Sequence, residues 1–215
     1  MLFVGLQGSY RRGEAREDSD IDILTVLDTV DLEDLDAYRA ILRRLPEGAK
    51  ASGFTCGRRE LGVWPAPELF QFVQDTDAYY GDLTEWVPEY TRRDTVSGAR
   101  ASVSALHHLG TYLYLAGESE SRSAELKAVY KGAFFAMQVV EYLRSGVYAR
   151  SRSDLLLRLS GDEADLIGLA GDGDALDARE RDEPGSAFRL LLEWTGNTMV
   201  ALAADRDALN SDCHS

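Results

Sequence analysis

Residues 7–26, QGSYRRGEAREDSDIDILTV, place two acids in an apolar run that follows a glycine–serine turn. Both the segment before this turn (residues 2–6) and the segment after it (residues 21–27) have the short apolar pattern typical of β-strands. Side chains at positions i and i+2 of a strand point to the same face. We therefore expect Asp20 and Asp22 to project together, with Ile21 and Ile23 facing the core.

This arrangement combines two carboxylates with a turn that can bind anions. Two neighbouring carboxylates repel each other unless a cation lies between them. A divalent ion removes that cost, and a pair of ions can hold a triphosphate and activate an acceptor oxygen. Gly8 and Ser9 follow a strand, so their backbone N–H groups and the serine hydroxyl can bind phosphate oxygens. Arg11 or Arg12 can add charge-assisted contacts, and Arg12 is the nucleotide-binding candidate.

The composition excludes several classes of function. The formal net charge of −14 argues against a nucleic-acid binder, which needs a basic surface. It is compatible with a cationic substrate, although acidity also simply confers solubility. The chain has only three histidines, so a metal is expected to be carboxylate-bound Mg²⁺ or Mn²⁺. Cys56 and Cys213 are far apart and fit a reducing cytoplasm, and no apolar run is long enough for a membrane span.

The pattern changes from mixed to helical near Pro88. Before it, we expect a helix over residues 31–45, strands over 52–56 and 68–76, and a turn over 77–83. After it, apolar residues recur at helical spacing over most of the chain, and the charged, glycine-rich residues 171–185 are expected to form a loop. The prediction is an α+β fold, with a small mixed-sheet domain over residues 1–88 and an all-helical domain over residues 89–215.

Residues 8–24, GSYRRGEAREDSDIDIL, resemble the signature of the DNA polymerase beta-type nucleotidyltransferase superfamily. The minimal and antibiotic-modifying members of this superfamily carry Gly-Ser, ten residues and then Asp-x-Asp. A looser likeness to small bacterial nucleotidyltransferase-domain proteins with a helical C-terminal domain extends to about residue 148. The resemblance implies a five-stranded mixed sheet, Mg²⁺ bound by Asp20 and Asp22, and a triphosphate bound at Gly8 and Ser9.

The same resemblance implies two further site residues. A third carboxylate from a later strand would act as a metal ligand or as the general base, and Glu60 is the candidate, with Glu68 and Asp75 as alternatives. Lys131 resembles a helical lysine that reaches the triphosphate. An ordinary solvent-facing helix lysine is the other interpretation of Lys131.

Together these features predict an enzyme that depends on Mg²⁺ or Mn²⁺. It would move a nucleoside monophosphate from a nucleoside triphosphate to an acceptor hydroxyl and release pyrophosphate. The acceptor would be a small molecule such as an aminoglycoside, or a protein. The alternative is an antitoxin-like regulatory protein that has the nucleotidyltransferase fold and modifies or masks a partner protein. We expect a cytoplasmic protein with neither a membrane nor a nucleic acid as partner, and a homodimer is compatible with either function.

Overall fold

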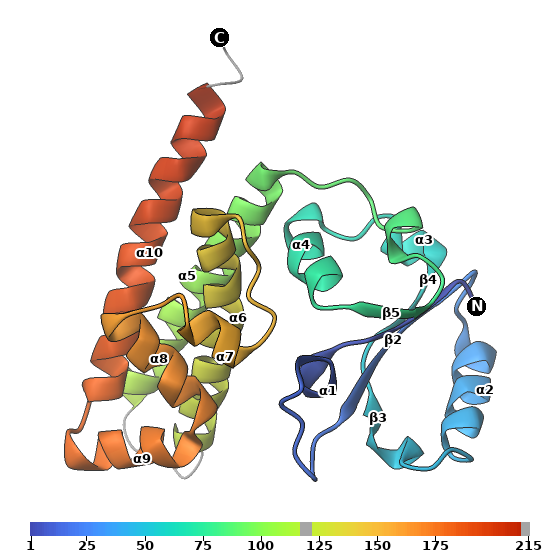
Figure 1. Cartoon of the computed structure of the whole chain (residues 1–215), viewed down its shortest axis with the longest axis horizontal. Coiled ribbons are helices and arrows are strands. Elements are labelled where there is room, and N and C mark those ends of the chain that lie inside the picture. Colours follow the sequence, from blue (N-terminus) through green and yellow to red (C-terminus); the bar gives the residue numbers. More distant parts are fainter. Residues whose placement is uncertain (117–121, 212–215) are drawn as a thin grey trace. The chain divides into compact units, whose positions relative to one another are not determined.

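The computed structural model describes residues 1–116 and 122–211, and the chain divides into two compact units, Met1–Thr91 and Arg92–Ser215. The described strands all lie in the first unit, and the described part of the second unit is helical (Figure 1). This arrangement confirms the predicted α+β fold class. The boundary between the units follows Thr91, close to the change of pattern at Pro88.

The first unit is built on a mixed sheet, as the resemblance implies. The sheet holds β1 (Phe3–Leu6), β2 (Ile21–Leu27), β3 (Ala51–Ser52), β4 (Thr55–Gly57) and β5 (Asp77–Tyr80). Strand β2 is central, because it pairs antiparallel with β1 and parallel with both β3 and β4. Strand β1 also pairs antiparallel with β5. The two strands that flank the Gly-Ser turn are therefore direct neighbours inside the sheet.

The core face of β2 differs from the predicted one. Leu24 and Val26 are fully buried, whereas Ile21 and Ile23 are only half-buried. Since side chains two residues apart share a face, Asp22 lies on the face of Leu24 and Val26, just before the buried residues begin. The prediction was wrong because the run IDILTVL has apolar residues on both faces, so alternation alone does not identify the core side.

One segment that we expected to be extended is helical. The predicted strand over 68–76 is mostly helix α4 (Ala66–Gln74), and the short helix α3 (Arg58–Leu61) follows β4. Pro67 occupies the first turn of α4, where the missing N–H of a proline costs no intrahelical hydrogen bond. Leu69 and Phe70 of this helix are buried. The strand lies instead at β5, in the segment that we expected to be a turn.

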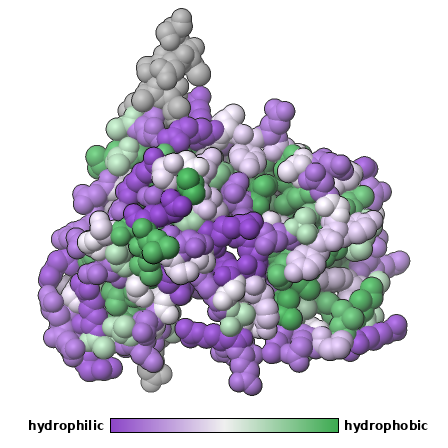
Figure 2. Space-filling view, in the orientation of Figure 1, coloured by the Kyte–Doolittle hydropathy of each residue, from purple (hydrophilic) through white to green (hydrophobic). Residues whose placement is uncertain are grey.

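Helix α2 (Leu32–Leu42) forms as predicted but buries none of its residues. Asp31 and Asp34 make a reciprocal capping box at its N-terminus. Leu32 is 79% exposed, and Leu35 and Ile41 are exposed as well. Hydrophobic residues are visible at the surface over this helix (Figure 2). The 3₁₀ turns Gly48–Lys50 (η1) and Leu83–Glu85 (η2) complete the unit.

The second unit consists of helices in the range that the structure describes. They are α5 (Arg92–Ala116), α6 (Arg122–Ser145), α7 (Arg152–Leu156), α8 (Gly161–Gly171), α9 (Gly173–Asp182) and α10 (Ser186–Ser211). Helix α5 packs against α6 and α10, and Tyr130, Phe134 and Met137 of α6 are fully buried as their spacing predicts. Helix α9 lies in the segment predicted to be a loop, because Asp172 caps its N-terminus and Leu176 anchors it. Among the described residues, no helix is long and apolar enough to cross a membrane.

Cys56 on β4 is expected to resist thiol reagents in the folded protein. Its side chain is buried among the apolar residues of the first unit, and burial, with a smaller contribution from Glu60, raises the pKa of its thiol to about 11. The reactive thiolate is therefore scarce until the pH approaches that value. The test is iodoacetamide labelling of a Cys213→Ser variant at pH 8. We expect no labelling of the native protein and full labelling in guanidinium chloride, and rapid labelling of the native protein would contradict this.

Candidate active site

The Gly-Ser turn lies directly against Asp22. Helix α1 (Gly8–Arg12) begins immediately after β1, and the backbone N–H of Gln7 donates to the carbonyl of Asp22 at 2.8 Å. Gly8 adopts a left-handed conformation with φ of +68°. A Cβ at this position would stand 1.8 Å from Oδ2 of Asp22, so only glycine fits. The turn predicted to bind phosphate and one predicted metal ligand therefore meet at one point.

The other oxygen of Asp22 is held by a neighbouring strand. Strand β3 pairs with β2 so that Ser52 lies beside Asp22, and the Ser52 hydroxyl donates to Oδ1 of Asp22 at 3.1 Å. Asp22 is half-buried, and Asp20, two residues earlier, is exposed. Among the described residues, no group of three histidine, cysteine or acidic side chains could hold a metal ion. Two carboxylates nevertheless fit Mg²⁺, which commonly takes one or two carboxylates and completes its shell with water and substrate phosphates.

Arg11 anchors the turn to the segment between α4 and β5. Its side chain is 1% exposed and lies 3.4 Å from carboxylate oxygens of both Asp75 and Asp77. It also donates to the backbone carbonyl of Gln74. Gln7 adds a second link, because its amide donates to the hydroxyl of Thr76 at 2.7 Å. These contacts fix α1 on the sheet, and so they set the position of Gly8.

Replacing Arg11 by methionine is expected to destabilise the first unit. The substitution leaves Asp75 and Asp77 without this buried cation, which costs about 2–4 kcal/mol for a largely buried pair. Thermal or urea unfolding measures the loss. Arg39→Met is the matched control, since Arg39 pairs with Asp36 at 2.6 Å but is 64% exposed. That change is expected to cost less than about 0.5 kcal/mol. Equal losses in the two variants would contradict the anchoring role.

Arg12, the arginine chosen as a nucleotide-binding candidate, is paired within its own turn. Its Nε lies 3.0 Å from Oε2 of Glu14, and its side chain is 8% exposed. Arg11 and Arg12 are adjacent in sequence, and nothing in the motif distinguishes the anchoring arginine from its neighbour. The role of Arg12 toward phosphate stays a prediction.

Glu60 lies far from the aspartate pair, in contrast to its expected role. It belongs to α3, and its carboxylate lies next to Gly57, which pairs with Leu27 at the far end of β2. Leu27 follows Asp22 by five residues along the strand, a separation of about 17 Å. The third carboxylate was expected to come from a strand. Glu60 lies instead on helix α3, which follows the end of β4. Of the alternatives, Glu68 accepts from the indole of Trp64, and Asp75 contacts Arg11.

Residues 2–51 match the family model described as a nucleotidyltransferase domain. This match contains the Gly-Ser turn, both aspartates and the helix that follows them. The chain carries a nucleotidyltransferase domain. The fold of the chain is also similar to that of the spectinomycin adenyltransferase AAD(9) from Enterococcus faecialis, whose crystal structure was solved with ATP and spectinomycin.

That structural likeness extends beyond the matched domain. It has a TM-score of 0.51 at 12% sequence identity, and it covers 92% of this chain and 91% of the adenyltransferase chain. The shared fold therefore includes the helical unit as well as the sheet. No curated protein sequence matches the chain.

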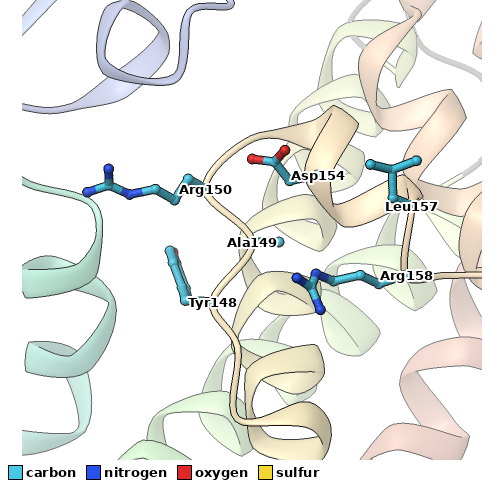
Figure 3. Close-up of a pocket in the computed structure, with 6 residues that line it drawn as sticks. All are labelled: Tyr148, Ala149, Arg150, Asp154, Leu157 and Arg158. Atoms are coloured by element: carbon cyan, nitrogen blue, oxygen red, sulfur yellow. The ribbon is translucent and has the colours of Figure 1, made fainter.

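Lys131 lies in the helical unit and is exposed on α6. Its role toward the triphosphate stays a prediction. The same unit has an open pocket of about 410 Å³ beside α7. Its lining includes two arginines, Arg150 and Arg158, with Tyr148 and Asp154 (Figure 3). No motif in the sequence marks these residues, which lie in and around a short connection.

Proposed function

We propose that this nucleotidyltransferase moves a nucleoside monophosphate from a nucleoside triphosphate to a hydroxyl of a small cationic acceptor. The reaction would depend on Mg²⁺ or Mn²⁺ and release pyrophosphate. The observation that carries the proposal is the direct contact between the backbone of Gly8 and the carboxylate of Asp22. Because of this contact, a triphosphate bound at the turn would lie beside the metal-binding carboxylates.

In the proposed site, some residues of the first unit bind the metal and others bind the phosphates. Asp20 and Asp22 would hold the metal, which when bound neutralises phosphate charge and favours attack on the α-phosphorus. The first N–H groups of α1 have no acceptor within the helix, so those of Gly8 and Ser9 can donate to phosphate oxygens. The Ser9 hydroxyl and Arg12 would add further contacts. The acceptor hydroxyl gives up its proton to solvent as its oxygen forms a bond to the α-phosphorus, the α–β bridging P–O bond breaks, and pyrophosphate leaves.

Charge and the structural likeness support the proposed class of acceptor. The chain has 37 acidic residues against 23 lysines and arginines, which favours the approach of a cation. The adenyltransferase of similar fold was solved with ATP and spectinomycin. We therefore propose ATP as the first donor to test, and an aminoglycoside-like amine with free hydroxyl groups as the acceptor.

The experiment is a transfer assay with each α-³²P-labelled nucleoside triphosphate and Mg²⁺. Spectinomycin, a panel of aminoglycosides and a protein extract serve as acceptors, and both pyrophosphate and labelled product are measured. The Asp20→Asn/Asp22→Asn double variant is the control. We expect pyrophosphate release that depends on the acceptor and on Mg²⁺ and that the double variant lacks. A wild type that neither binds a triphosphate with Mg²⁺ nor releases pyrophosphate with any acceptor would refute the proposal.

A further inference from the structure

Ser52 is the neighbouring side chain that donates to the metal-binding carboxylate. Its hydroxyl lies 3.1 Å from Oδ1 of Asp22, while Oδ2 of the same carboxylate faces the backbone of Gly8. The two residues are 30 positions apart in sequence, and the parallel pairing of β2 with β3 brings them together. The Asp22 carboxylate is thus confined on both of its oxygens.

The backbone on either side of Ser52 is fixed against β2. Ala51 pairs with Ile21 before it. Gly53 follows with φ of +117°, and a Cβ there would stand 2.4 Å from the backbone oxygen of Ile23. The backbone N–H of Phe54 then donates to that same oxygen at 3.1 Å. The position of the Ser52 backbone is therefore set by the sheet and not by a flexible loop.

We propose that Ser52 is a positioning residue that orients Asp22 for the divalent metal, an inference that rests on the proposed function. A carboxylate at the exposed end of a strand can rotate about its side-chain bonds, and rotation weakens metal binding. A hydroxyl that donates to one oxygen fixes the carboxylate plane and leaves its remaining lone pairs available. Because the hydroxyl is neutral, it orients the aspartate without adding to the repulsion between Asp20 and Asp22.

The inference predicts a specific loss in the variant Ser52→Ala. Its affinity for Mn²⁺ is expected to fall about tenfold, in the range seen when the hydrogen-bond partner of a metal ligand is removed. Thermal stability without metal should stay close to that of the wild type, because the hydroxyl is exposed. Ser52→Thr keeps a hydroxyl and suits a β-strand, so this variant is expected to restore most of the affinity.

The test is a titration with Mn²⁺, in the absence and in the presence of ATP. Electron paramagnetic resonance measures the concentration of the free ion at each step. Thr84→Ala is the matched control, because the Thr84 hydroxyl also donates to an aspartate, Asp82, at 2.7 Å. Both residues follow the end of β5 that pairs with Val4. This variant should bind Mn²⁺ like the wild type. If Ser52→Ala binds Mn²⁺ as tightly as the wild type, the role of Ser52 is overturned, but the proposed function is not. The same holds if Ser52→Ala and Ser52→Thr lose equal affinity for Mn²⁺. A wild type without affinity for Mn²⁺ would overturn the proposed function as well.

Discussion

Replacing Asp22 by asparagine is expected to lower nucleotidyl transfer on the order of 10³-fold, or about 4 kcal/mol in the barrier, while the protein stays folded. The substitution removes the negative charge that would hold the divalent ion. The amide oxygen of asparagine can still accept the hydrogen bond from Ser52, so the local structure is retained. Initial rates of pyrophosphate release at saturating Mg²⁺ measure the effect, and circular dichroism checks the fold.

The matched control is an aspartate just after the other end of the same strand. Asp28 follows β2, is 63% exposed and pairs with Arg58 at 3.0 Å. Asp28→Asn removes the same charge from the same unit, and exposed ion pairs contribute little. Its rate is therefore expected to equal that of the wild type. If the two substitutions lower the rate equally, the effect comes from net charge and the assignment of Asp22 to the metal is wrong.

Replacing Gly8 by alanine is expected to lower transfer by about 100-fold, because a misplacement of about 1 Å in a site is enough for such a loss. The added Cβ would stand 1.8 Å from Oδ2 of Asp22, so the carboxylate or the turn must move. The left-handed backbone adds about 1–2 kcal/mol of strain. Both Mn²⁺ affinity and the transfer rate should fall, and each is measured directly.

Gly13→Ala separates the strain from the clash. Gly13 has φ of +70°, close to that of Gly8, yet a Cβ there would meet nothing within 4 Å. The control is therefore expected to lose about 1–2 kcal/mol of stability and to keep its Mn²⁺ affinity. Should Gly8→Ala behave like Gly13→Ala in both measurements, the close approach of Gly8 to Asp22 would not matter for the site.

The short-range part of the candidate site could be proposed from the sequence because its residues lie in one continuous segment. Gly8, Ser9, Asp20 and Asp22 fall within residues 8–22, and strand alternation and helix-terminus chemistry apply to such a segment directly. Helical periodicity likewise predicted α6, because its apolar face is continuous from Leu126 to Val140 and is buried. The segment at residues 68–76 was misjudged because a short apolar run fits a strand as well as a helix.

The donor chemistry that we propose for this chain comes from the sequence by itself, because the motif's residue types and spacing favour a phosphate-binding turn beside a carboxylate pair. The tertiary structure alone decided which distant residues contact the turn and the carboxylate pair, and which do not. Ser52 reaches Asp22, Arg11 reaches Asp75 and Asp77, and Glu60 is separated from the pair, all through the pairing and packing of distant segments. Strand register and the burial of each face depend on contacts between residues far apart in the chain, and local patterns do not encode them.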